Sequence, residues 1–123
     1  MIRQVHLFFL DQKFRDKVEH QYALLFVTPE HNRSIPAVFK NAIDVGFRPF
    51  GKSVWGPKPA LIVSQSRSNL SGFGANHHFR QVLVVQNVYP IGQPEVYLTN
   101  VCDLVDEKGE IKKQSKIYFY NQW

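Results

Sequence analysis

Polar side chains that can bind a ligand are concentrated between Thr28 and Ser34. These seven residues carry hydroxyl, carboxylate, imidazole, amide and guanidinium groups, which offer more hydrogen-bonding capacity than a simple turn requires. An apolar run at residues 22–27 precedes the segment, and a helical pattern of apolar residues follows it. A strand, a polar loop and a helix in this order form a βα unit, in which ligands bind at the carboxyl end of the strand. The alternative is a capped turn that binds nothing.

A second polar segment covers residues 64–74 and follows a second apolar run at residues 59–63. It is rich in serine and asparagine and ends with Gly72 and Gly74. Glycine permits a positive φ and a close approach to the backbone, and backbone N–H groups in such a loop can bind a ligand oxygen or a phosphate. Because this loop lies one βα unit after the first, the two polar segments together indicate one ligand site.

Metal and nucleophile chemistry find little support in the residue pattern. His77 and His78 are adjacent and would point about 100° apart on a helix, unlike the i, i+4 pair that binds zinc, so we expect no metal site. Cys102 is predicted in a loop with no basic neighbour to activate its thiol, and we expect a small buried or semi-buried residue there. The sequence contains no GxSxG, GxGxxG or Walker motif, so nicotinamide would have to bind without a Rossmann site.

The length of 123 residues suits one domain, residues 1–123, with a core that needs no disulfide or metal. A single cysteine favours a reducing compartment. No run approaches the ~18 apolar residues of a membrane span, and the first ten residues lack a secretory cleavage pattern. We therefore expect a soluble cytoplasmic protein without a membrane partner.

The net charge of +5 is compatible with nucleic-acid binding, but the basic residues are scattered, and we do not expect a nucleic-acid partner. No carboxylate occurs between Asp44 and Glu95. The basic residues of that segment predict a positive field suited to a phosphorylated ligand, with an ordinary solvated surface as the alternative. These basic residues are Arg48, Lys52, Lys58, Arg67 and Arg80.

Two helices and a strand are expected around the first loop. Asp11 is predicted to cap a helix that continues to about residue 21, with Phe14 and Val18 on its inner side. The strand at residues 22–28 shows no period-2 alternation, as expected for burial on both faces of a parallel sheet. Ser34 is predicted as the N-cap of the next helix, which ends near Gly46.

Several further elements follow from periodicity and turn residues. Residues 48–58 are predicted as a surface loop in which Phe50 and Trp55 pack as anchors, the alternative being rings that stack on a ligand. The remaining predictions are a short strand at 5–10, a buried strand at 59–64, a helix at 75–87, a strand at 94–99, a turn at 106–109 and a helix at 114–122.

The segment TPEHNRSIPAVFKNAID, residues 28–44, resembles the flavin loop and following helix of the NAD(P)H-dependent FMN reductase family. This flavodoxin-like group includes chromate and quinone reductases, and it usually has Tyr where this chain has His31. Residues 56–60, 79–83 and 93–97 are similar to further family segments in the same order. The resemblance implies an α/β fold with a parallel sheet and flanking helices.

The resemblance also implies a mechanism based on FMN and NAD(P)H. Hydride would pass from nicotinamide through the flavin to a small-molecule acceptor, such as a quinone, a metal oxyanion, an azo compound or free flavin. No side chain need act as a catalytic acid or base. The implied cofactor-binding positions are Pro29, Glu30, His31, Asn32 and Ser34 in the first loop, and Ser64, Ser66, Gly72 and Gly74 in the second, with Arg33 as an anion contact and backbone N–H groups near Ser66 and Gly72 as donors.

The chain departs from the family at its front end. Members open with a strand and a polar loop that holds the FMN phosphate at a helix start, whereas here no Ser, Thr or Gly precedes Thr28. We therefore expect a truncated domain that lacks the first strand and phosphate loop and binds FMN weakly. The strand at residues 22–28 should have an open edge that invites pairing with residues 5–10 or with another chain, as in a homo-oligomer. The alternative function is a non-catalytic, degenerate scaffold or oligomerising subunit.

Overall fold

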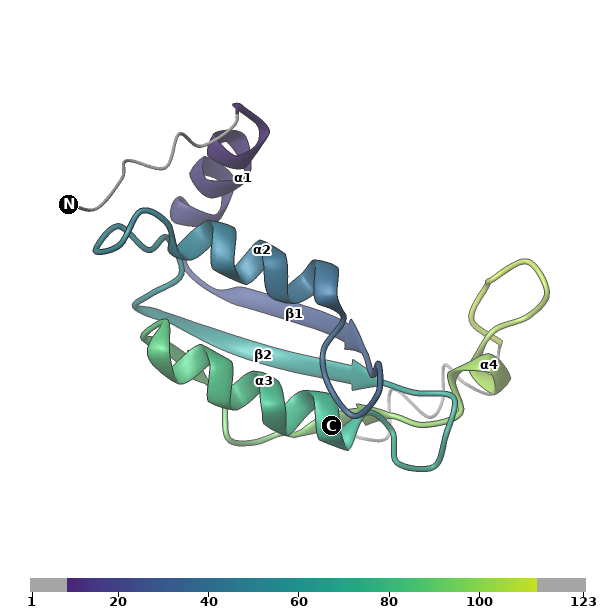
Figure 1. Cartoon of the computed structure of the whole chain (residues 1–123). Coiled ribbons are helices and arrows are strands. Elements are labelled where there is room, and N and C mark those ends of the chain that lie inside the picture. The colour runs from purple at the N-terminus through teal and green to yellow at the C-terminus, as the bar shows by residue number, and fades with distance from the viewer. Residues whose placement is uncertain (1–8, 113–123) are drawn as a thin grey trace.

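A computed structural model describes residues 9–112 of the chain. It is an α/β fold in which a parallel sheet is flanked by helices, as the sequence predicts (Figure 1). The elements in chain order are α1 (Phe9–Glu19), β1 (Leu24–Pro29), α2 (Ala37–Phe47), β2 (Lys58–Gln65), α3 (Phe73–Val85), β3 (Val88–Pro90), β4 (Val96–Leu98) and α4 (Val101–Leu104).

Strand β2 lies at the centre of the sheet and all of its partners are parallel to it. β1 pairs along one side, with Leu24 opposite Ala60 and Thr28 opposite Ser64. On the other side β3 pairs with the start of β2 and β4 with its end. The strand predicted at 94–99 is therefore present, although shorter, whereas β3 was not predicted. Within residues 9–112 no strand pairs with the other side of β1, so in this part of the chain the edge of β1 is open, as expected.

An aromatic cluster joins the helices to the sheet. The ring of Phe26 in β1 lies 4.8 Å from Phe79 of α3, 5.9 Å from Phe39 of α2 and 5.8 Å from Trp55, measured between ring centroids. Phe79 is fully buried. Burial of each such side chain contributes about 1.5–3 kcal/mol, so this cluster fixes the positions of α2 and α3 and of the loops that precede them.

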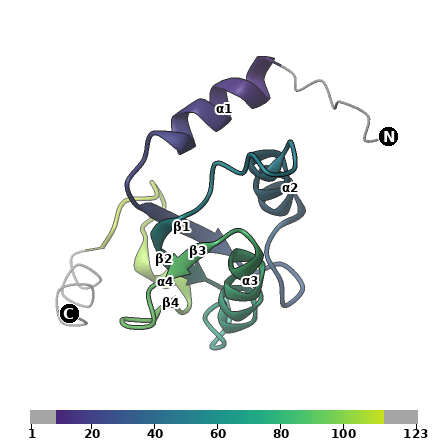
Figure 2. The same ribbon diagram turned by 90° about the vertical axis from the view of Figure 1, so that its left-hand side faces the viewer.

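The strands are buried on one face and not on two, which corrects the prediction for residues 22–28. Phe26 and Thr28 are 6% and 1% exposed, whereas Leu25 and Val27 are 64% and 60% exposed. The reason is that α2 and α3 lie on the same face of the sheet (Figure 2). β2 follows the same alternation, because Ala60, Ile62 and Ser64 are buried and the residues between them are at least partly accessible.

Both predicted helix caps are displaced by a few residues. α2 begins at Ala37 with Pro36 as its N-cap, so Ser34 does not cap it. Proline disfavours the helical conformation of the residue before it, which prevents the helix from starting closer to Ser34. α1 begins at Phe9, which places Asp11 in the first turn rather than at the cap.

The packing of α1 agrees with the prediction, whereas the predicted end of α2 is displaced slightly. Phe14 and Val18 pack against the core. Gly46 lies within the last turn of α2 and not beyond it. The indole of Trp55 occupies the space where a Cβ at this position would stand. Trp55 is 3% exposed and Phe50 is 75% exposed, so the prediction that both rings pack as anchors is confirmed for Trp55 and is wrong for Phe50.

Parts of the predicted pattern lie outside residues 9–112. The predicted helix at 114–122 and residues 5–8 of the predicted first strand fall in this category, while residues 9 and 10 of that strand belong to α1. α3 begins two residues earlier than predicted, the turn at 106–109 is present, and α4 was not predicted. Within the described part of the chain, none of the helices has the length and apolar character required to cross a membrane.

Candidate functional site

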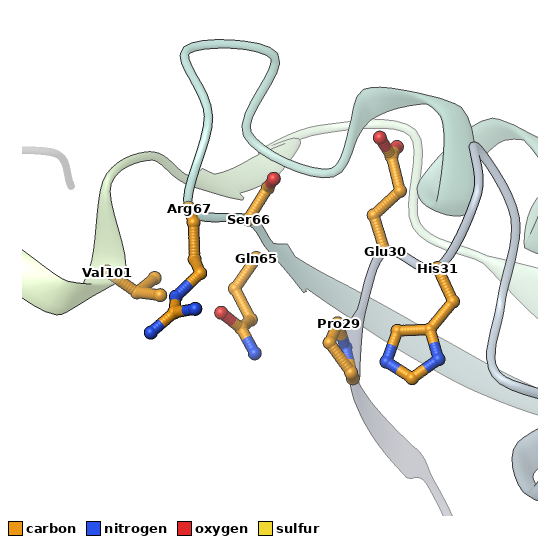
Figure 3. A pocket seen from close by; sticks show the side chains of 7 residues that line it. All are labelled: Pro29, Glu30, His31, Gln65, Ser66, Arg67 and Val101. Carbon is orange, nitrogen blue, oxygen red and sulfur yellow. The ribbon is translucent and has the colours of Figure 1, made fainter.

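The two polar segments meet at the carboxyl ends of β1 and β2. Pro29 and Gln65 are register partners, and the backbone N–H of Glu30 donates to the carbonyl of Gln65 at 3.0 Å. A cleft of about 370 Å³ opens between the loops (Figure 3). It is lined by Pro29, Glu30, His31, Gln65, Ser66, Arg67 and Val101.

The first loop closes into a tight two-residue turn. The backbone N–H of His31 donates to the carbonyl of Ser34 at 2.8 Å, and the N–H of Ser34 donates to the carbonyl of His31 at 2.9 Å. Asn32 and Arg33 between them have φ values of 50° and 66°, as in the turns that connect hairpin strands. Asparagine tolerates this region and arginine does so at a cost of about 1–2 kcal/mol. The turn therefore holds His31 at the mouth of the cleft.

Glu30 connects the two loops through its side chain. Its Oε2 accepts a hydrogen bond of 3.0 Å from the backbone N–H of Ala75 in the first turn of α3, and its Oε1 lies 3.4 Å from Arg33 Nη1. The Glu30 side chain is only 7% exposed and points away from His31 and Gln65 (Figure 3). A carboxylate at a helix start is stabilised by the helix dipole, so this group both caps α3 and fixes the spacing of the loops.

Gly72 and Gly74 allow α3 to pack between the loops. A Cβ at Gly72, whose φ is +77°, would stand 2.9 Å from Gln65 N and Ser64 Cβ. A Cβ at Gly74 would stand 2.9 Å from the Arg33 carbonyl oxygen and Glu30 Oε2. Both glycines are thus required for close approach, but the groups they approach belong to the protein itself. Neither lines the cleft.

The serines of the second segment serve mainly the loop itself. Ser64 is fully buried, with its Oγ 3.4 Å from the Ser71 carbonyl and from Asn76 Nδ2. Ser66 does line the cleft, but its N–H donates to the carbonyl of Leu98. The expectation of a free backbone donor at Ser66 is therefore not met, because β4 takes that group.

Ser34, of the first segment, also turns away from the cleft. Its Oγ lies 2.6 Å from His78 Nδ1, which links the turn at residues 31–34 to the exposed side of α3. Asn32 sits at the tip of that turn and is exposed. Neither residue lines the cleft.

Sequence reasoning did not name Gln65 or Val101 as ligand residues, and it named Arg67 only as part of the positive segment. Gln65 could have been found because it is the last residue of β2, and Arg67 follows two residues later, but Val101 belongs to α4 and has no local signal. Arg67 Nε also lies 3.2 Å from Cys102 Sγ, and this contact raises the pKa of the Arg67 guanidinium. Cys102 lies in α4 and not in a loop, is exposed, and has a basic neighbour, which corrects all three expectations for it.

The basic side chains of residues 45–94 do not gather at the cleft, although the sequence predicted a positive field suited to a phosphorylated ligand. Of its five basic side chains only Arg67 lines the cleft. Lys58 is buried and donates to the Val54 carbonyl, and Arg80 donates to Asn76 and to the Ile91 carbonyl. Across residues 9–112, no group of three or more His, Cys, Asp or Glu side chains is arranged to hold a metal ion.

The cleft has the lining and the size of a small-molecule site. Pro29 and Val101 present apolar surface from opposite sides, while Gln65 and Arg67 carry an amide and a guanidinium between them (Figure 3). Such a mixture of apolar walls and a few convergent polar groups is typical of small-molecule and cofactor sites. The volume exceeds what a single bound water would need by an order of magnitude.

Comparison with known proteins decides the family. The model of the NADPH-dependent FMN reductase family matches residues 10–103. This chain belongs to that family. The match spans α1 to α4 and so includes both polar loops and every strand described above, in agreement with the resemblance of residues 28–44.

Individual members of the family are similar over the same region. A quinone reductase of Pseudomonas putida is 45% identical over 105 residues, which are 85% of this chain and 56% of that protein. A 2-hydroxy-1,4-benzoquinone reductase of a Burkholderia species is 39% identical over 98 residues, 80% of this chain and 54% of that protein. The chain thus spans little more than half the length of these family members.

A solved structure shares the fold of this FMN reductase family member. FerB of Paracoccus denitrificans, a flavoenzyme NAD(P)H:(acceptor) oxidoreductase, superposes with a TM-score of 0.77 at 29% identity. The superposition covers 89% of this chain and 60% of FerB. The parallel sheet with its helices is therefore the flavodoxin-like fold that the resemblance implied.

Proposed function

We propose that the chain carries the flavin-ring half of an NAD(P)H-dependent reductase that uses FMN to reduce a quinone. The observation that carries the proposal is the cleft between Pro29–His31 and Gln65–Arg67, at the strand ends where α/β folds bind ligands. Family membership and two relatives named for quinone reduction support the same activity. Metal oxyanions, azo compounds and free flavin are further acceptors within the proposal, as is action in the cytoplasm.

We assign the ring contacts to the residues that line the cleft. Pro29 and Val101 would provide apolar walls, and the Gln65 amide and Arg67 guanidinium would donate to ring oxygens or nitrogens. His31 would cover the ring at the mouth of the cleft. When bound, FMN supplies hydride acceptance and donation, and the role of these side chains is to orient the ring and stabilise negative charge on it.

Other predicted cofactor positions receive a supporting role in this proposal. Asn32 and Ser34 form the turn that presents His31, and Ser64, Gly72 and Gly74 pack the second loop onto β2. Glu30 lines the cleft, but its carboxylate is directed to the first turn of α3, where it accepts from the Ala75 N–H. These residues would set the width of the cleft rather than contact the ring through their side chains.

The FMN phosphate has no comparable site among residues 9–112. The first turn of α3 already holds the Glu30 carboxylate at the Ala75 N–H, and a second anion there would be repelled. α4 begins at Val101, which lines the cleft, but it has only four residues and the Val101 N–H donates to the Ser66 carbonyl. Charge-assisted contacts to phosphate contribute about 1.5–3 kcal/mol each. We therefore expect this chain to bind FMN more weakly than micromolar, or about −8 kcal/mol.

A non-catalytic role is the second candidate, in which the domain is a scaffold or an oligomerising subunit. The specific observation in its favour is the open edge of β1 together with the exposed side chains of Leu25 and Val27 beside it. Sheet edges of this kind are available for pairing with a second copy of the chain.

An FMN titration followed by a turnover assay separates the two candidates. The purified chain is titrated with FMN while its thermal midpoint is recorded, because a ligand of the folded state must raise that midpoint. Oxidation of NADPH and NADH is then followed with 1,4-benzoquinone, chromate, an azo dye and free FMN as acceptors. A midpoint that rises with FMN and turnover with quinone support the reductase. A chain that forms oligomers and responds to neither FMN nor nicotinamide supports the scaffold.

A further inference from the structure

An apolar groove lies at the opposite end of the molecule from the cleft, near the amino ends of the strands. It has a volume of about 410 Å³ and is lined by side chains that include Phe47, Phe50, Val85 and Asn87. Phe50 is 75% exposed and Val85 is 70% exposed, and Val84 next to it is 72% exposed. Isolated exposed apolar residues are ordinary, but a cluster around a groove marks an interaction site.

The loop that presents Phe50 is held firmly from two directions. Arg15 of α1 is buried and donates to the Gly46 carbonyl at 2.8 Å and to the Lys52 carbonyl at 2.7 Å. On the other side, Trp55 Nε1 donates to the Ile43 carbonyl at 2.8 Å. Because these buried contacts enclose the turn, Phe50 is displayed in a fixed position against Phe47 and not collapsed into the core. A preorganised aromatic side chain loses little entropy on binding.

The charges around the groove select the kind of partner. Arg48 and Lys52 flank Phe50 in the sequence and both are exposed. No carboxylate occurs from residue 45 to residue 94, and the nearest one in α2, Asp44, is paired with Lys40 at 2.6 Å. Arg15 offsets the negative end of the α2 dipole. Lys52 also lines a neighbouring cavity with Arg15 and Glu19 of α1, so this carboxylate offsets part of the positive charge there. The groove lining itself carries no charged side chain, and the exposed charges that adjoin it in the chain are the cations Arg48 and Lys52.

We propose that the groove around Phe50 docks an acidic peptide segment of another protein, anchored by one apolar side chain. The apolar anchor would fill the space between Phe47, Phe50 and Val85, and flanking Asp or Glu residues would pair with Arg48 and Lys52. A second copy of this chain is the less favourable occupant, because a symmetric contact would bring Arg48 and Lys52 of both copies together. The proposal does not depend on the proposed reductase activity.

Selection from a random peptide library on phage tests the docking groove. The full chain is immobilised and bound phage are selected at low and at physiological ionic strength. We expect enriched peptides to carry Asp or Glu around a Leu, Ile, Phe or Trp residue. Their synthetic forms should bind about tenfold more weakly to Phe50→Ser, and again to the charge reversal Arg48→Glu/Lys52→Glu. The matched controls are Val38→Ser, which removes an equally exposed apolar residue of α2, and Lys108→Glu/Lys112→Glu.

Any of three outcomes of the peptide selection would overturn the docking proposal. The first is enrichment of basic or uncharged peptides. The second is a set of peptides whose affinity for Phe50→Ser matches that for the unaltered chain, and the third is the absence of any enrichment above the Phe50→Ser background. Sedimentation equilibrium adds a further check, since self-association that is lost in Phe50→Ser would assign the groove to a second copy and also refute the proposal. Circular dichroism of each variant excludes misfolding as the cause.

Discussion

The carboxylate of Glu30 accepts a hydrogen bond of 3.0 Å from the backbone N–H of Ala75, across 45 residues of sequence. This contact joins the loop after β1 to the first turn of α3. The first two residues of α3 belong to the second polar segment, residues 64–74. The two walls of the cleft therefore share one side chain, and the distance between them depends on it.

Replacement of Glu30 should loosen both loops. Glu30→Ala removes the cap of α3, for which the expected loss is about 1 kcal/mol of unfolding free energy. Glu30→Gln retains an acceptor and should lose only about 0.3–1 kcal/mol. Urea denaturation measures both variants, with Glu107→Gln as an exposed control. Equal stability of Glu30→Ala and the unaltered chain would show that the contact has no energetic weight.

The contact of Gly46 with Trp55 should make Gly46→Ala destabilising. Alanine in place of glycine normally favours a helix by about 0.5–1 kcal/mol. Here the new methyl group would overlap the buried indole, which costs about 1–3 kcal/mol, so the clash should win. Thermal unfolding of Gly46→Ala should show a lower midpoint, whereas Gly92→Ala, with no atom near its Cβ position, should not. A raised midpoint for Gly46→Ala would contradict this packing.

Arg67 should matter for ligand binding and not for folding. Arg67→Gln removes the one exposed guanidinium that lines the cleft. Because the variant loses one charge-assisted hydrogen bond to the ligand, we expect the FMN dissociation constant to rise about tenfold. Arg48→Gln is the matched control, since Arg48 is also exposed but lies outside the cleft. A similar loss of FMN affinity in both variants would indicate a general charge effect.

Ionisation of the Tyr97 phenol should lower the unfolding free energy at alkaline pH. Burial, a hydrogen bond to Glu95 and the charge of Glu95 raise the pKa of Tyr97 from 10.0 to about 12. The unfolded chain then loses this proton at lower pH than the folded chain, so the stabilisation is complete below about pH 10 and is lost between about pH 10 and 12. Tyr97→Phe should remove this part of the pH dependence. The measurement is the unfolding free energy of the unaltered chain and of Tyr97→Phe between about pH 10 and 12. If both free energies fell by the same amount with pH, Tyr97 would not contribute to the pH dependence.

The exposed face beside β1 should tolerate charge. Leu25 and Val27 are mostly exposed, so Val27→Lys should change the unfolding free energy by less than about 0.5 kcal/mol. If copies of the chain associate through this edge, the same variant should shift the protein to monomer in sedimentation experiments. Ile62→Lys, on the buried face of β2, should instead abolish folding. A large destabilisation by Val27→Lys would mean that the face is covered.

The sequence alone predicted the main strands and helices around the cleft, but not β3 or α4. Hydrophobic periodicity and turn residues are local properties, so the strands at β1, β2 and β4, the helices around them and the two polar loops could all be predicted. The meeting of those loops follows from parallel strand pairing. The resemblance of residues 28–44 pointed to the FMN reductase family that the comparisons establish.

Only the tertiary structure decided the direction of individual side chains. Glu30 and Ser34 turn toward α3, Gly74 packs on Glu30, and Arg67 meets Cys102, because residues far apart in the chain compete for the same hydrogen bonds and space. The burial of one sheet face likewise depends on where α2 and α3 pack, which no local pattern specifies. A strand sequence records apolar character, but which face is covered is a property of the whole fold.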